Sequence, residues 1–110
     1  MSTDASGPAN TLVLYHPKPG KEMDLARLLD RHWPTLRGLG LVTNQAAQVW
    51  RARDKRSGAA YFVEIFQWRD ARAPDIAHQT PQVMAVWESM GPLLDSMQLA
   101  QLEPLNAPVA

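Results

Sequence analysis

The chain has 110 residues and no cysteine, and its eleven Lys and Arg residues balance eleven Asp and Glu residues. This length predicts one domain with its own core. The lack of cysteine excludes disulfide scaffolds, thiolate metal sites and thiol nucleophiles, a composition that a reducing cytoplasm permits. The balanced charge gives no net field that would attract nucleic acid or an anionic membrane, so we expect neither as a partner.

The two ends of the chain predict little structure. Residues 1–10 are small and polar and lack the basic and apolar regions of a signal peptide. Residues 104–110 contain two prolines and few side chains that could pack. We therefore expect flexible tails at 1–10 and 104–110 and a single domain over 11–103. No apolar run approaches the length of a membrane span, so we also expect a cytoplasmic protein.

The first third of the domain predicts a strand followed by a helix. A β-branched and aromatic run at 11–16, stopped by Pro17 and Pro19, indicates the strand. From Lys21 onward, apolar residues recur every three or four positions and form one stripe of a helix that Gly38 and Gly40 end. The stripe consists of Leu25, Leu28, Leu29, His32 and Leu36.

Two strands follow, at 45–52 and 60–68, and the charged turn at 53–58 between them predicts a hairpin. The second of these strands is the most hydrophobic run in the chain and is apolar on both faces. One face carries Phe62, Phe66 and Trp68, with Glu64 among them, since side chains alternate along a strand. Burying these aromatic groups requires a partner surface.

The last third predicts a second helix and a final strand. Thr80 is suited to the N-cap and Pro81 to the first helical position, and residues 73–79 form a preliminary turn. The apolar stripe repeats that of the first helix at an offset of 58 residues, from Leu25 to Val83. Its members are Val83, Val86, Trp87, Met90 and Leu94. Pro34 and Pro92 share this offset and are expected on the outward sides of their helices. Residues 97–103 supply the last strand.

The resulting order is strand, helix, strand, strand, helix, strand, which predicts an α+β, ferredoxin-like βαββαβ fold. Its antiparallel sheet carries two helices on one face. The other face of the sheet would then expose apolar side chains, and an exposed patch of that size usually marks an interface. We therefore expect a homodimer through the sheet face, with Phe62, Phe66 and Trp68 in the interface.

Three segments carry a resemblance to a known family. They are the strand from Phe62 to Trp68, the Ala77-His78-Gln79-Thr80-Pro81 run that opens a helix, and Lys18-Pro19-Gly20-Lys21 after the first strand. Over residues 11–103 the chain resembles the antibiotic biosynthesis monooxygenase-like members of the dimeric α/β-barrel superfamily. The resemblance implies a dimer of ferredoxin-like protomers, each with a pocket between sheet and helices. It further implies cofactor-independent oxygenation of an electron-rich aromatic substrate.

The residues are compatible with this chemistry. The sequence has no glycine-rich phosphate loop, no nucleophile elbow and no clustered metal-ligand spacing. A cofactor-free enzyme needs a base and an aromatic wall. Glu64 or His78 could act as the base. The wall could be built from Tyr15, Phe66, Trp68 and Trp87. Haem-degrading relatives carry their ligand histidine well along the second helix, where this chain has none, so we predict no cofactor.

Each candidate also has a structural alternative. Glu64 could pair with Arg51 or with another basic group across the sheet or the dimer, since an unpaired buried carboxylate is costly. His78 could bond nearby backbone, and His32 on the first helix is expected to be a hydrogen-bonded core residue. An iron site of two histidines and one carboxylate, from His16, His78 and Glu64, is geometrically conceivable, but we predict no metal.

Two functions remain open at this stage. The first is a cofactor-independent monooxygenase, or a related proton-transfer enzyme, acting on a small aromatic or polyketide-like compound. The second is a non-catalytic homodimer of the same fold that binds a small apolar ligand or serves in a stress response. The enzyme would need an enclosed pocket with Glu64 or His78 pointing into it, whereas the structural dimer would have that space filled and both groups paired.

Overall fold

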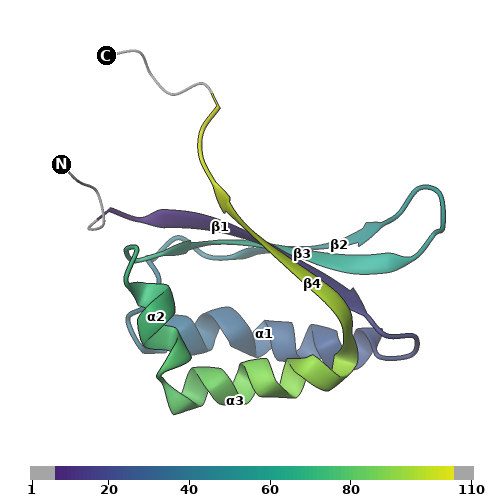
Figure 1. Ribbon diagram of the computed structural model, residues 1–110, viewed down its shortest axis with the longest axis horizontal. Coiled ribbons are helices and arrows are strands. Elements are labelled where there is room, and N and C mark those ends of the chain that lie inside the picture. The colour runs from purple at the N-terminus through teal and green to yellow at the C-terminus, as the bar shows by residue number, and fades with distance from the viewer. Residues whose placement is uncertain (1–6, 106–110) are drawn as a thin grey trace.

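The computed structural model describes residues 7–105, which form a four-stranded antiparallel sheet with helices on one face (Figure 1). The elements in chain order are β1 (Ala9–Pro17), α1 (Glu22–Gly38), β2 (Gln48–Arg53), β3 (Ala60–Trp68), α2 (Ala73–His78), α3 (Pro81–Met90), a 3-10 helix (Gly91–Leu93) and β4 (Leu94–Leu102). The strand order is β2-β3-β1-β4. The ferredoxin-like α+β fold expected from the sequence is confirmed. The expected tails fall largely on residues 1–6 and 106–110, outside the described residues.

The central strands β1 and β3 pair in a register that places their inward side chains together. Val13 lies opposite Glu64, and Tyr15 lies opposite Phe62. Helix α1 covers this face with the predicted stripe, of which Leu25, Leu29, His32 and Leu36 are buried. The core therefore lies between the sheet and the helices, and hydrophobic burial of this layer is the main contribution to folding.

The boundaries of several elements differ from the sequence-based expectation. The preliminary turn at 73–79 is a short helix, α2, and β1 starts at Ala9. The second strand starts at Gln48, three residues later than expected, and β4 starts at Leu94, three residues earlier. Pro34 lies inside α1 on its exposed side, as expected. Pro92 is exposed but lies in the 3-10 helix beyond the end of α3, where its missing N–H is tolerated.

The expected dimer face must be corrected. Phe62, Phe66 and Trp68 are only 5 %, 4 % and 7 % exposed and face the helices of their own chain. The interface was assigned to the wrong face because both faces of β3 are apolar, and the alternation of side chains alone does not tell which face the helices cover. The uncovered face instead carries half-buried apolar residues and one tryptophan, Trp50, that is 59 % exposed. The half-buried residues are Leu12, Leu14, Tyr61, Val63 and Ile65.

None of the helices within residues 7–105 is both long enough and apolar enough to cross a membrane.

Candidate functional site

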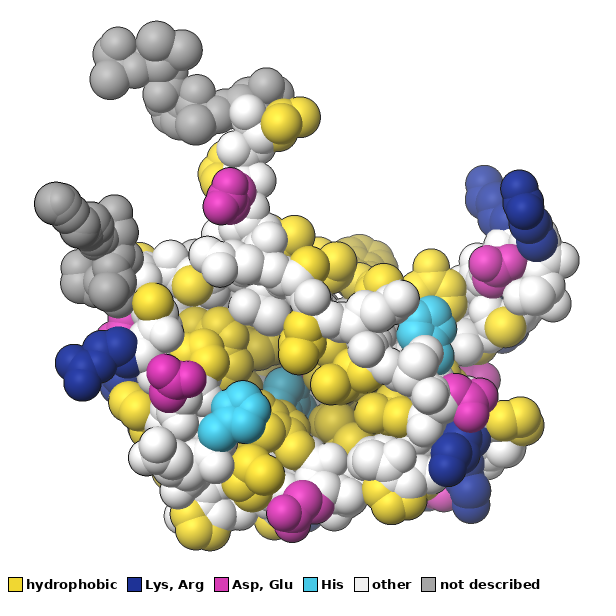
Figure 2. Space-filling model, viewed as in Figure 1, with side chains coloured by type: hydrophobic (Ala, Val, Ile, Leu, Met, Phe, Trp, Pro, Cys, Tyr) yellow, Lys and Arg dark blue, Asp and Glu magenta, His cyan; other side chains and the backbone are white. Residues whose placement is uncertain are grey.

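A cavity of about 430 Å³ lies between the sheet and the C-terminal helices. Side chains from all three helices and from β1, β3 and β4 line it, together with Gly91 of the 3-10 helix. Figure 2 shows the molecule hollowed between sheet and helices, with mainly hydrophobic side chains in the hollow. The lining includes no Lys, Arg, Asp or Glu among the described residues. The four residues expected to form an aromatic wall all line this cavity: Tyr15, Phe66, Trp68 and Trp87.

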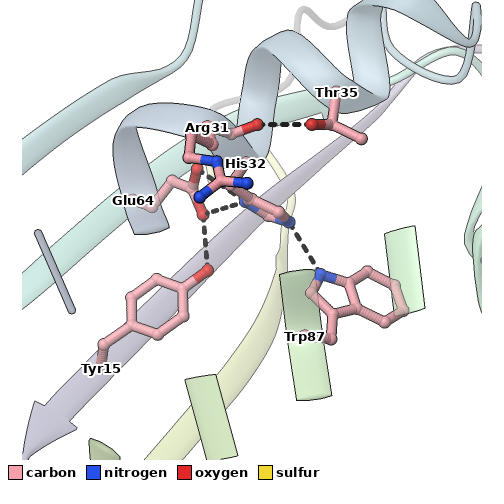
Figure 3. Close-up of polar contacts among 6 residues, drawn as sticks. All are labelled: Tyr15, Arg31, His32, Thr35, Glu64 and Trp87. Atoms are coloured by element: carbon pink, nitrogen blue, oxygen red, sulfur yellow. Dashed lines mark hydrogen bonds and ion pairs between the residues drawn. The ribbon is translucent and has the colours of Figure 1, made fainter. Parts of the chain in front are cut away.

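At the base of the cavity, four side chains from four elements form one hydrogen-bonded row, which we call the buried polar chain (Figure 3). The Tyr15 hydroxyl donates to Glu64 Oε1 at 2.6 Å. His32 Nδ1 lies 3.0 Å from each carboxylate oxygen of Glu64. Trp87 Nε1 donates to His32 Nε2 at 2.9 Å. The members of the buried polar chain are therefore Tyr15, Glu64, His32 and Trp87.

The protonation states in the buried polar chain follow from the hydrogen-bond partners of its members. An indole N–H can only donate, so His32 Nε2 must accept and the proton must be on Nδ1. His32 is therefore a neutral imidazole that donates to Glu64, and Glu64 accepts at both oxygens, as an ionised carboxylate does. Burial first, and then the charge and hydrogen bond of Glu64, raise the pKa of Tyr15. Tyr15 thus stays protonated at neutral pH and cannot act as a base.

Glu64, one of the two bases considered from the sequence, is not among the residues that line the cavity. The side chain is completely buried beneath Tyr15 and His32, which do line the cavity. Arg51, the partner considered for Glu64, pairs instead with Glu22 on α1 at 2.7 Å. Arg51 lies opposite Phe62 in the sheet register, and its guanidinium lies over that ring at 5.9 Å. The polar groups of Tyr15 and His32 therefore satisfy Glu64 in place of a cation.

His78, the other base considered from the sequence, is among the residues that line the cavity. Its Nδ1 donates to the backbone carbonyl of Pro74 at 2.8 Å, the local bond expected for this position. The carbonyl can only accept, so Nδ1 carries a proton, and in the neutral form of the ring the lone pair is on Nε2. No hydrogen bond of Nε2 is found within residues 7–105. The ring also packs against Trp87, with centroids 4.8 Å apart.

The iron site considered from the sequence is not assembled. His16 stacks on Tyr61 and contacts Gln98 on the uncovered face of the sheet, whereas Glu64 and His78 lie on the helix side. Within the described residues, no group of three or more His, Cys, Asp or Glu side chains could hold a metal ion.

His32 is the site residue that the sequence reasoning did not select. It was expected to be a hydrogen-bonded core residue, and it is indeed 3 % exposed with both nitrogens paired. It also lines the cavity and connects Glu64 to Trp87. The only signal in the sequence was a histidine within an otherwise apolar helical stripe, because a buried imidazole needs polar partners on both sides.

Comparisons with known proteins identify the fold. No protein-family model and no curated protein matches the sequence. Among solved structures, PA3566 from Pseudomonas aeruginosa is 20% identical and superposes with a TM-score of 0.68, over 94% of this chain and 99% of that one. SnoaB, a cofactor-independent oxygenase from Streptomyces nogalater, is 14% identical with a TM-score of 0.71, over 91% and 95%. The chain has the fold of these proteins.

A third similar structure bears on assembly. It is a dimeric ferredoxin-like protein of unknown function from Jannaschia, 18% identical with a TM-score of 0.69, covering 89% of this chain and all of that one. At these identities the likeness concerns the fold alone. A structure described as an antibiotic biosynthesis monooxygenase also matches, with a TM-score of 0.68 and 16% identity, over 88% of this chain and 98% of that one. This likeness of fold agrees with the resemblance to antibiotic biosynthesis monooxygenase-like proteins seen in the sequence.

Proposed function

We propose that this protein is a cofactor-independent monooxygenase of a small, neutral, electron-rich aromatic compound that binds in the cavity between sheet and helices. The observation that carries the proposal is the cavity itself. It is about 430 Å³ in volume, has aromatic side chains and no charged side chain among its described lining residues, and includes a histidine with a free lone pair. Ligand sites of enzymes are commonly mainly apolar cavities of this size with a few placed polar groups.

In the proposed reaction, His78 Nε2 removes a proton from a phenolic or enolic hydroxyl, or from the carbon beside it. The electron-rich anion then reacts with dioxygen. One oxygen atom forms a carbonyl at a ring methylene, and the other leaves as water with the two hydrogens of that methylene. The substrate supplies all the electrons, so the balance needs no external reductant. The similarity of the fold to a protein described as a cofactor-independent oxygenase supports this reaction class.

Glu64 acts indirectly in this scheme. Its carboxylate holds the Tyr15 hydroxyl and the Nδ1 proton of His32, and His32 in turn accepts the Trp87 N–H. Trp87 is the ring against which His78 packs. We therefore assign Glu64 and His32 as positioning residues and His78 as the base. Phe66 and Trp68, whose rings contact each other with centroids 5.0 Å apart, contribute to the substrate-binding wall together with Tyr15 and Trp87.

The active form in this proposal is a homodimer that packs through the uncovered sheet face. Leu12, Leu14, Val63 and Ile65 on this face are only half-buried in the single chain, and Trp50 on the same face is 59 % exposed. A contiguous apolar surface of this kind usually marks an interface. Proteins of the same fold that are described as dimeric support this assembly.

One observation favours the second candidate, a binding protein without catalysis. The hydrogen-bonding groups at the base of the cavity satisfy one another, which is the arrangement of a stable polar core. In that case His78 would orient a ligand without accepting a proton from it.

The test is oxygen consumption with anthrone-type and phenolic substrates, with the quinone product detected by absorbance. Transfer of a proton by a positioned side chain contributes roughly 10²- to 10⁴-fold, so His78→Ala should lower kcat by at least about 100-fold. His16→Ala, a histidine on the opposite face of the sheet, is the matched control and should retain full activity. Ligand binding without oxygen consumption by the wild-type protein would favour the binding protein instead.

A further inference from the structure

The N–H and O–H groups of four described residues that line the cavity are all used internally. Tyr15 donates to Glu64, His32 donates to Glu64, Trp87 donates to His32, and His78 donates to the Pro74 carbonyl. A hydroxyl oxygen that donates its proton still has lone pairs, and a neutral imidazole has one. The part of the lining around Tyr15 and His32, the Tyr15–His32 end, therefore offers a ligand a hydrogen-bond acceptor and aromatic faces, but no free side-chain donor among the described residues.

The other end of the cavity differs. Thr11 and Gln101 lie opposite each other in the sheet, and both line the cavity. Thr11 is four residues from Tyr15 along β1, which corresponds to about 13 Å along a strand. The Thr11 hydroxyl and the Gln101 amide can each donate or accept. The indole N–H of Trp68, which has no protein acceptor within residues 7–105, adds a donor near this end.

The negative charge of Glu64 adds to the difference between the two ends of the cavity. The carboxylate of Glu64 is fully buried directly behind Tyr15 and His32, and the described residues that line the cavity include no Lys or Arg. An anionic ligand group at the Tyr15–His32 end would lose its hydration and face another negative charge, both of which are unfavourable in a low-dielectric site.

From these contacts we propose a selection rule for the ligand: the cavity takes a neutral molecule that presents a hydrogen-bond donor to the Tyr15–His32 end, and it discriminates against ethers, quinone carbonyls and carboxylates at that position. Glu64 is the specificity-determining residue, because its two accepted hydrogen bonds turn the donors of Tyr15 and His32 away from the ligand. The rule rests on the ligand-binding part of the proposed function. It also implies that a hydroxylated substrate binds more tightly than its oxidised quinone product, which favours product release.

Three probes of similar shape test the rule: 1-naphthol, 1-methoxynaphthalene and 1-naphthoate. Binding is measured at pH 7 under nitrogen by quenching of tryptophan fluorescence, so that no turnover is required. The ether is the more hydrophobic molecule, and it would bind at least as well as the naphthol if the cavity selected ligands by hydrophobicity alone. We expect 1-naphthol to bind about tenfold more tightly than the ether, because a buried acceptor left without a donor is costly. Binding of 1-naphthoate should be at least about 100-fold weaker than that of 1-naphthol.

Glu64→Gln tests the assigned residue. The amide N–H₂ of glutamine takes the Tyr15 oxygen as its acceptor and releases the Tyr15 O–H toward the ligand. The preference for the naphthol over the ether should then fall to less than about threefold. Glu22→Gln, the same change at the partly exposed partner of Arg51, should leave the tenfold preference intact. Tyr15→Phe removes an acceptor at this end and should also reduce the preference for the naphthol. It replaces Glu64→Gln as the test if that variant does not fold.

Equal binding of the naphthol and the ether to the wild-type protein would overturn the rule, as would an unchanged preference in both Glu64→Gln and Tyr15→Phe. Selective binding without oxygen consumption would leave the rule standing and refute the monooxygenase. Oxygen consumption without selective binding would refute the rule and leave the monooxygenase standing. Failure of all three probes to bind would overturn the rule together with the assignment of the cavity as a ligand site.

Discussion

Replacing Glu64 with methionine should destabilise the protein far more than an ordinary change of carboxylate to methionine. Methionine fills a similar unbranched space and removes only the acceptors. The Tyr15 hydroxyl and the His32 Nδ1–H would then lose their partner while 2 % and 3 % exposed, respectively. A buried donor left without an acceptor costs about 1–3 kcal/mol. Two such donors would cost roughly 2–6 kcal/mol.

One effect opposes this loss of stability in Glu64→Met. Removing Glu64 also removes the cost of keeping a charge in the core, so the net change falls toward the lower part of that range. We expect the free energy of unfolding to drop by about 2–4 kcal/mol, a large fraction of the roughly 5–15 kcal/mol of a typical domain. Urea unfolding at pH 7 measures the change. Protein concentration is held fixed, because a dimer's apparent stability depends on it.

Two further variants separate the polar contribution from simple substitution effects. Glu22→Met removes a carboxylate that is 33 % exposed and paired with Arg51, and such surface pairs contribute only about 0–1 kcal/mol. Tyr15→Phe should destabilise the wild-type protein but be neutral or stabilising in the Glu64→Met background, because it removes one orphaned hydroxyl. The interaction energy of this double-mutant cycle should exceed about 1 kcal/mol. A loss below 1 kcal/mol for Glu64→Met, or additive effects of the two changes, would refute the reasoning.

Three other predictions concern the surface. Ile65→Asp should convert the dimer to monomer in size-exclusion chromatography with light scattering, and a monomeric wild type would reject the proposed interface. Pro34→Ala should be neutral or stabilising in urea unfolding, because it restores a helical N–H on the exposed side of α1, whereas a loss above about 2 kcal/mol would mean that the kink shapes the core. Asp54 accepts the backbone N–H groups of Arg56 and Ser57 at 2.8 Å each. The bond from Ser57 first, and then that from Arg56, lowers the pKa of Asp54. The contribution to turn stability is therefore present above the unfolded pKa of about 3.9 and is lost as pH falls through the lower folded value. NMR shifts of the two amides should follow this titration, and shifts that move only near pH 3.9 would contradict it.

The order of elements could be derived from the sequence alone because it depends on local patterns. Apolar residues every three or four positions specify α1 and α3, while alternating runs specify the strands. Thr80 and Pro81 mark the start of α3 correctly, because an N-cap and a missing N–H are properties of adjacent residues. The alternation of β3 also places Phe66 and Trp68 together on one face, but it does not tell which face borders the cavity.

Only the tertiary structure decided which face of β3 the helices cover and what Glu64 contacts. Both faces of β3 are apolar, so the choice depends on how α1 and α3 pack over the whole sheet. The partners of Glu64 come from positions 15 and 32, which are 49 and 32 residues away in the chain. A local pattern carries no information about such pairs. The sequence could indicate that a carboxylate among aromatic residues needs partners, but the register of β1 against β3 and the rotation of α1 determined that these are Tyr15 and His32.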